Sequence, residues 1–323
     1  MDLIFVVKLV IWLLVGVLLF FGMIRKKGVG LAPILFMCGL FVFVDCLAFL
    51  VAGPFEDVGA VAFQNPGDPL NLLFFVVVLL VFTAIVLLII RLKKKEALRI
   101  IFLGSATLLI FYVLYPVLLI FVINDVFALG LSMLGAALLL ILLLKKPEWY
   151  VIDAVAVLIG VGAVAMIGIS LDIWIVIVLL AVMAVYDALS VYRTKHMIDL
   201  ADSVMDLNLP VMFVIPKKRG YSLLLKRKGL KEKLQDGEER EAYFLGLGDV
   251  VFPGILAVAA FHGLAVNGLI MAVAVLAGTL VGFFALMSYV VKGKPQAGLP
   301  LLCSGAVLGY VVAGFLLFGL PPI

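Results

Sequence analysis

The chain has 323 residues, of which 66% are hydrophobic and 14% charged, with a formal net charge of +4. A water-soluble fold of this length cannot hide so much apolar surface, so a soluble globular protein is excluded and lipid is the natural solvent. The three cysteines, Cys38, Cys46 and Cys303, lie inside apolar runs, spaced for neither a disulfide framework nor a zinc site.

Ten apolar runs follow one another along the chain, each of roughly 19–25 residues, which is enough to cross a bilayer at about 1.5 Å per residue. In lipid each backbone polar group needs an internal partner, so we expect these runs to be helices. The fold class predicted is an all-α polytopic membrane protein. The runs are 3–24, 31–53, 70–90, 99–123, 126–144, 150–169, 172–192, 243–264, 268–290 and 298–318.

Lysine and arginine fall in alternate loops, which predicts the orientation of the chain. Apart from Lys8, all of them lie on one side of a ten-helix arrangement. By the positive-inside rule these loops are cytoplasmic and both termini lie outside the cell membrane. The run 3–24 lacks a basic start, so a retained helix is favoured over a signal peptide. The basic loops are Arg25–Lys27, Arg91–Arg99, Lys145–Lys146, Arg193–Arg240 and Lys292–Lys294.

The long loop 193–240 contains an apolar, β-favouring run between two prolines, Leu209–Pro216. Such a run is either a loop segment tucked against the helices or an edge strand that pairs with an extended peptide. Upstream of it, residues 195–206 have the pattern of a short amphipathic helix.

Four charged residues lie well inside the apolar runs, and each is a functional candidate because burying a charge in a bilayer is costly. Lys8 and Asp45 both lie about seven or eight residues from the outer ends of their helices, so we expect them to pair and dock the first helix onto the rest. The other two are Asp187 and Asp249.

Asp187 lies about five residues before the cytoplasmic end of its helix, and Asp249 about six residues into the next one. Two carboxylates at matching depth on antiparallel helices can face each other and share one proton. The ionised member then activates water while the protonated member polarises a carbonyl, as aspartyl hydrolysis requires. The string Gly246-Leu247-Gly248-Asp249 permits close approach of a substrate backbone. Helix packing around a buried acid is the structural alternative for that string.

Together these motifs resemble the presenilin and signal peptide peptidase family of GxGD intramembrane aspartyl proteases. They are Tyr186-Asp187, Gly246-Leu247-Gly248-Asp249 and Pro300-Leu301-Leu302. Two further stretches, Ala52-Gly53-Pro54-Phe55 with Asn65-Pro66 and Thr194-Lys195-His196-Met197, look like archaeal presenilin homologues. The resemblance implies a nine-helix core over about residues 31–320, with 3–24 as an extra helix.

Several site roles follow from the resemblance alone. It implies that Asp187 and Asp249 are catalytic and that the segment 209–216 pairs with an extended substrate. The family's Pro-Ala-Leu motif is not intact: either Pro300-Leu301-Leu302 replaces it, which we favour, or Ala297-Gly298-Leu299 does. The residues expected to bind substrate are Tyr186, Gly246, Leu247, Gly248, Pro300, Leu301, Leu302, Val211, Phe213 and Val214.

The expected organisation is an extra helix and basic loop at 1–30, a five-helix scaffold at 31–169, and a catalytic part at 170–323. The expected substrates are transmembrane helical peptides in the lipid bilayer, with no cofactor, no metal and no partner subunit. Nucleic acid is not an expected partner, because the basic residues are spread over five loops. No His-Glu-x-x-His zinc motif, phosphate loop or serine elbow occurs.

Two other functions compete with this interpretation. A prepilin peptidase-like enzyme also uses a GxGD aspartate, but Val250-Val251-Phe252-Pro253 follows the acid here instead of that family's Lys-Leu pattern. An ion-coupled transporter would use paired intramembrane carboxylates to bind its ion. Transport predicts broken helices in inverted repeats, and Gly246–Asp249 has no counterpart in the first half of the sequence.

Overall fold

The computed structural model describes residues 31–92, 94–122, 124–194, 210–217, 242–290 and 296–322. The expected first helix at 3–24, Lys8 within it, and the expected amphipathic helix at 195–206 lie outside these described residues.

Nine α-helices account for most of the described chain, and eight of them are long and apolar enough to span a bilayer. The polytopic all-α fold expected from the sequence is therefore confirmed. Their ends agree with the apolar runs to within a few residues in most cases. The helices are α2 (Leu31–Asp57), α3 (Leu70–Arg91), α4 (Lys95–Phe121), α5 (Asp125–Lys145), α6 (Trp149–Ser170), α7 (Ile173–Leu189), α10 (Leu247–Gly263), α11 (Gly268–Val290) and α12 (Leu299–Phe318).

The expected helix at 243–264 is the exception, because its first residues form a strand. β2 (Ala242–Gly246) pairs antiparallel with β1 (Met212–Pro216), and α10 begins only at Leu247. The run 209–216 supplies a partner strand far away in the sequence, which an expectation from local hydropathy could not include. As a result, α10 has 17 residues and Asp249 is its third residue rather than its sixth.

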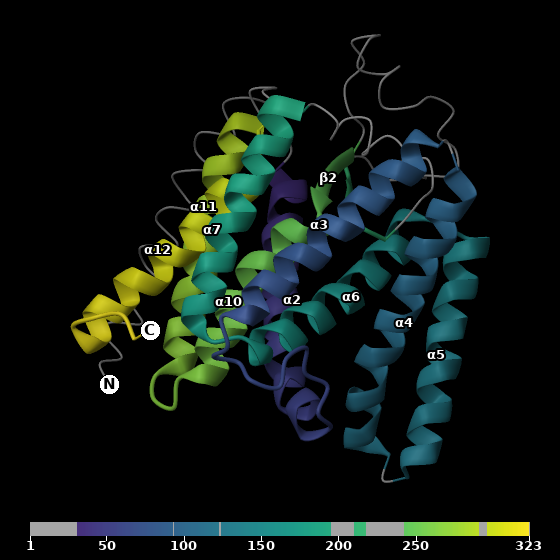
Figure 1. Ribbon diagram of the computed structural model, residues 1–323, viewed down its shortest axis with the longest axis horizontal. Coiled ribbons are helices and arrows are strands. Elements are labelled where there is room, and N and C mark those ends of the chain that lie inside the picture. Colours follow the sequence, from purple (N-terminus) through teal and green to yellow (C-terminus); the bar gives the residue numbers. More distant parts are fainter. Residues whose placement is uncertain are drawn as a thin grey trace.

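α10 lies at the centre of the molecule and contacts α2, α6, α7, α11 and α12 (Figure 1). Nearly all of its residues from Val250 to Ala260 are buried. A helix that is apolar on every side and packed by protein on every side forms the core of such a bundle. The middle of α10 is thereby placed inside the protein, and Leu247, Gly248 and Asp249 at its start are half-buried.

α3, α4 and α5 form the outer part of the bundle. α4 and α5 lie at the right of Figure 1. Among the described residues of α3 only Val86 is buried, and α5 packs mainly on α4. Many large side chains of α3 and α5 face outward, as expected of helices that contact lipid.

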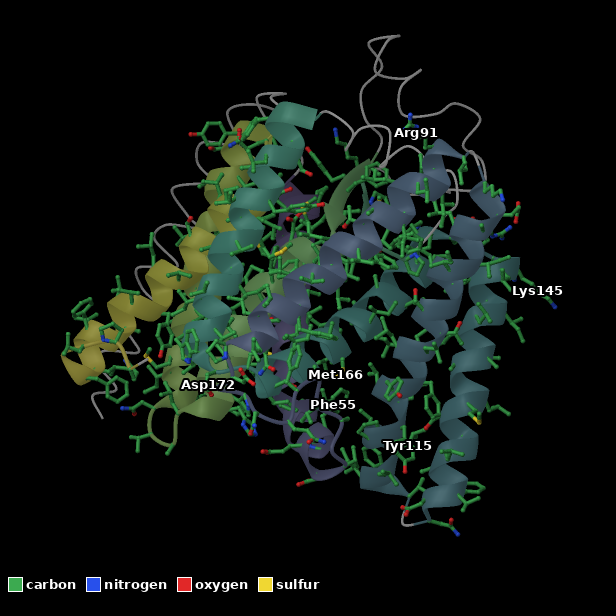
Figure 2. The ribbon with its side chains drawn as sticks, in the orientation of Figure 1. Phe55, Arg91, Tyr115, Lys145, Met166 and Asp172 are labelled. Carbon is green, nitrogen blue, oxygen red and sulfur yellow. The ribbon has the colours of Figure 1, made fainter. Side chains whose placement is uncertain are left out.

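Arg91 and Lys145 are basic residues in the last turns of α3 and α5. In Figure 2 Arg91 lies near the upper end of the molecule and Lys145 at about half its height on the right, and both lie higher than Asp172 and Tyr115.

Candidate active site

Asp187 projects from the last turn of α7 into the interior. Only 6% of it is exposed, and its Oδ2 accepts a hydrogen bond from the N–H of Leu299 at 3.1 Å. Three residues after the acid the α-helix gives way to a π-helix, η1 (Ser190–Thr194). A π-turn widens the helix and is often found at functional sites.

Asp249 lies in the first turn of α10, where the helix dipole favours a negative charge. Gly246 is the N-cap, with extended backbone angles of φ −60° and ψ 137°. The carboxylate is half-buried and lies against two glycines. A Cβ on Gly298 would be 2.7 Å from Asp249 Oδ1, and one on Gly246 would be 3.2 Å from Oδ2. Its position therefore depends on the absence of side chains there.

The two acids meet at one dipeptide, Gly298-Leu299, at the start of α12. Asp187 accepts the amide of Leu299, while Asp249 lies against the α-carbon of Gly298. The two carboxylates are also close enough to interact electrostatically. Two such groups inside a protein share one proton, because both cannot ionise cheaply side by side. The arrangement has the parts of an aspartyl dyad.

α12 is held in place by close packing on α11. A Cβ on Gly278 would overlap the carbonyl oxygen of Gly305, and one on Gly282 would overlap that of Leu301. Gly305 and Gly309 meet α11 backbone in the same way. Small residues allow membrane helices to approach to backbone contact. This seam fixes where Gly298-Leu299 sits relative to the acids.

The structure places the two candidate versions of the Pro-Ala-Leu motif differently. The acids contact Gly298 and Leu299, which belong to the alternative Ala297-Gly298-Leu299. Leu302 is fully buried, and the backbone of Leu301 and Leu302 packs on α11. Pro300 occupies the first turn of α12, where its missing N–H costs nothing.

Three more of the expected residues adjoin the two acids in the sequence. Tyr186 is half-buried and packs against the core beside Asp187. Leu247 packs on α6, where a Cβ on Gly160 would be 3.3 Å from its Cδ1. Gly248 is half-buried beside Phe252, whose ring would be 3.5 Å from a Cβ on Gly248.

The β-favouring run is indeed a strand, and it is built into the site. In β1, Phe213 and Val214 are buried, and the carbonyl of Val211 accepts the N–H of Leu247 at 3.1 Å. β1 is thus tied to the first residue of α10, two residues before Asp249.

Sequence reasoning missed one buried acid, Asp153. It lies in the second turn of α6, is only 6% exposed, and its Oδ1 accepts the N–H of Val214 at 2.8 Å. An acid that close to a helix end normally reaches water, so we did not count it as intramembrane. The signal that would have found it is its position after Trp149-Tyr150-Val151-Ile152, inside the apolar run.

The other two residues of interest lie away from the dyad. Asp45, 3% exposed, packs against α10, with its Oδ1 2.5 Å from the Cβ position of Gly254; its expected partner Lys8 lies outside the described residues. At the ends of α10 and α2, the exposed His262 places its Nε2 2.9 Å from Glu56 Oε2. Among the described residues no three His, Cys, Asp or Glu side chains gather.

Fold and site together define a polytopic membrane protein with a pair of interior aspartates. A family model described as "Signal-peptide peptidase, presenilin aspartyl protease" matches residues 38–320. The chain therefore belongs to this family, and it is an intramembrane aspartyl protease with a multi-pass membrane fold.

Solved structures agree with this assignment. The chain is similar to a presenilin family intramembrane aspartate protease in the C222 space group, with 31% identity and a TM-score of 0.65, over 88% of this chain and 99% of that one. It is likewise similar to such a protease in the P2 space group, with 32% identity and a TM-score of 0.63, over 87% and 96%. No curated protein matches. The transporter and prepilin peptidase alternatives receive no support from these findings.

Proposed function

We propose that Asp187 and Asp249 form the catalytic dyad that hydrolyses peptide bonds of transmembrane substrates. The observation that carries the proposal is that carboxylates from α7 and α10, 62 positions apart in sequence, meet at the same dipeptide, Gly298-Leu299. No cofactor and no partner subunit enters the proposed chemistry.

With one proton on the pair, the chemical steps balance. The ionised carboxylate takes a proton from water while the oxygen of that water forms a bond to the substrate carbonyl carbon. The protonated carboxyl gives its proton to the carbonyl oxygen, leaving a neutral gem-diol. The C–N bond then breaks as the protonated carboxyl gives its proton to the leaving nitrogen and the ionised carboxylate takes a proton from a hydroxyl of the gem-diol. One water is consumed, and the dyad returns to its starting state.

We further propose that the substrate binds as an extended strand beside the β1–β2 sheet, because a helical carbonyl is screened by its own turn. The outer edge of β1 is a poor place for it, since Asp153 already accepts the N–H of Val214 and Pro216 has no N–H. A substrate strand would therefore add at β2, with β1 behind it. In this arrangement Val211, Phe213 and Val214 support the sheet from behind. The residues that flank the scissile bond are Tyr186, Gly246, Leu247, Gly248, Pro300, Leu301 and Leu302, together with Gly298 and Leu299.

The proposed orientation has the basic loops in the cytoplasm and both termini outside. Because Asp187 lies near the end of α7 and Asp249 near the start of α10, cleavage would take place in the cytoplasmic third of the bilayer. We propose that residues 31–169 act as scaffold and residues 170–323 carry the chemistry.

The test is cleavage of a model transmembrane peptide by purified protein in liposomes. Asp187→Ala and Asp249→Ala should each abolish product formation, while thermal unfolding shows that both variants remain folded. A transition-state analogue of aspartyl proteases should block the wild type. Asp125→Ala, which removes an exposed acid at the start of α5, is the matched control and should cleave normally. Product formation by either dyad variant would refute the assignment.

A further inference from the structure

One face of α6 contacts the catalytic machinery at two points. Asp153 and Gly160 are seven residues apart, two helical turns, so they lie on the same face. Asp153 accepts the amide of Val214 in β1, and Gly160 receives the side chain of Leu247 at the start of α10. α6 thus holds both the sheet and the helix to which the sheet is connected.

The direction of the Val214 amide follows from the strand pairing. Val214 lies opposite Phe244, and three positions along the ladder the N–H of Leu247 donates to the carbonyl of Val211. Hydrogen-bonded and non-hydrogen-bonded pairs alternate along an antiparallel ladder. The N–H of Val214 therefore points away from β2, toward the outer edge of the sheet. Asp153 Oδ1 occupies the position that a third strand's carbonyl would take.

Neither end of this hydrogen bond is replaceable by water in the structure. Asp153 is 6% exposed and Val214 3% exposed. The second carboxylate oxygen of Asp153, Oδ2, is buried and has no hydrogen-bond partner within the part of the chain that the structure describes. A buried amide that loses its acceptor destabilises the protein by the full free energy of its desolvation. A polar group kept here at that cost points to a role beyond packing.

β2 transmits the position of β1 to the dyad. The strand ends at Gly246, and Asp249 follows three residues later. A shift of β1 by a fraction of an ångström therefore moves β2, and with it both the proposed substrate edge and the Asp249 carboxylate. Misplacement of about 1 Å is enough to slow a reaction about 100-fold.

We propose that Asp153 is a positioning residue for proteolysis: by accepting the Val214 amide it closes the outer edge of β1 and sets which substrate bond faces the two acids. This rests on the proposed function of Asp187 and Asp249. Asp153 does not touch the substrate; it acts through β1 and β2.

The experiment compares two replacements that share the branching of Asp153 at Cγ. Asp153→Asn keeps an acceptor oxygen for the Val214 amide, and Asp153→Leu has the same branching but no acceptor. Steady-state cleavage of a model transmembrane peptide is measured in liposomes, and the product ends are determined by mass spectrometry. Asp153→Asn should stay within about threefold of wild type and cut the same bond. Asp153→Leu should turn over about tenfold more slowly and spread its cuts over neighbouring bonds.

The distribution of product ends separates positioning from stability. It is a ratio among products, so it does not depend on the fraction of molecules that is folded. If Asp153→Leu does not fold, Val214→Pro removes the same hydrogen bond from the donor side. Proline fits this edge in principle, since Pro216 occupies the next outward-facing position of β1. Val214→Pro should shift the cuts in the same way.

Three outcomes would overturn the proposal. One is an unchanged cutting pattern in Asp153→Leu, or in Val214→Pro where Leu does not fold. Another is a distribution of cuts in Asp153→Asn as broad as that in Asp153→Leu. It would show that the oxygen accepting the Val214 amide does not set the cleavage site. The last is the same spread in Asp125→Leu, the exposed control acid. Failure of the dyad itself looks different, because Asp187→Ala and Asp249→Ala would then still form product.

Discussion

α10 and α3 are both apolar helices, yet their surroundings are opposite. The most apolar stretch of α3 has a mean hydropathy of 3.5, the highest among the eight candidate spans, but only Val86 of its described residues is buried. α10 is too short to be counted among those spans, and protein surrounds it on all sides. In Figure 1 the helices that pack on α10 include α2, α6 and α7.

The difference lies in the size of the side chains. α3 contains no glycine and is made largely of leucine, valine, isoleucine and phenylalanine, whereas α10 carries Gly254, Ala257, Ala259 and Ala260 along its buried middle. Lipid tails are as apolar as leucine, so hydrophobicity does not drive one helix onto another inside a bilayer. Close approach between small residues does. Of these two helices, hydropathy therefore finds the span in lipid, and small residues mark the one inside the protein.

From this comparison we expect the largest effect when a small residue next to the two acids is enlarged. In Gly298→Val the new side chain would occupy the space of the Asp249 carboxylate, 2.7 Å from the Cβ position. We expect kcat for cleavage to fall about 100-fold, which is about 2.7 kcal/mol in the barrier. The melting temperature should change little. Gly104→Val in the outer helix α4, where nothing lies within 4 Å, is the control. A Gly298→Val enzyme within threefold of that control would show that the acids are not confined by α12.

Substitutions in the close contact between α11 and α12 should have nearly as large an effect, but on stability rather than on catalysis. In Gly305→Ala the added methyl group would overlap the carbonyl oxygen of Gly278, so the two helices must separate. We expect the free energy of unfolding to fall by about 2 kcal/mol in a denaturant titration. Gly130→Ala in α5, which has open space around it, should be neutral. Equal effects of the two would contradict the distinction between the inner and outer helices.

A third pair of variants tests packing without glycine. Leu256 of α10 is fully buried, and Leu80 of α3 is 47% exposed. Leu256→Ala leaves a cavity in protein and should cost about 1–2 kcal/mol, less than in a soluble core because the unfolded helix also sits in an apolar solvent. Leu80→Ala should cost less than about 0.5 kcal/mol, since lipid fills the gap. Thermal unfolding of both variants in the same detergent makes the measurement. A larger cost at Leu80 would reverse the comparison.

The smallest effect is expected at the end of α10, where the helix emerges from the protein interior. His262 and Glu56 are 2.9 Å apart, with side chains 31% and 59% exposed. Glu56→Gln should lower the free energy of unfolding by less than about 1 kcal/mol, and the difference should shrink at high salt. Asp57→Asn, at the neighbouring exposed position, is the control for removing a charge there. A loss above about 2 kcal/mol would mean that this pair is part of the core.

The features that the sequence predicted are those set by neighbouring residues, and the features it missed depend on partners distant in the sequence. The spans were predictable, because lipid requires about 20 apolar residues in a row and a helix satisfies its own backbone. The strand Met212–Pro216 was predictable as a propensity, from prolines that bracket a β-favouring run. The strand at 242–246 was not, because its apolar residues continue into α10 without interruption and only the partner strand makes it extended.

The sequence alone determined that this chain crosses a membrane many times and that Asp187 and Asp249 lie in neighbouring apolar segments, since composition and spacing are local properties. Tertiary structure decided the remainder. It brought Gly298-Leu299 rather than Pro300-Leu301-Leu302 to the acids, and it placed Asp153 under β1. The first depends on how α12 packs on α11, which close backbone contacts at glycines set. The second depends on β1, a strand distant in sequence, packing on α6.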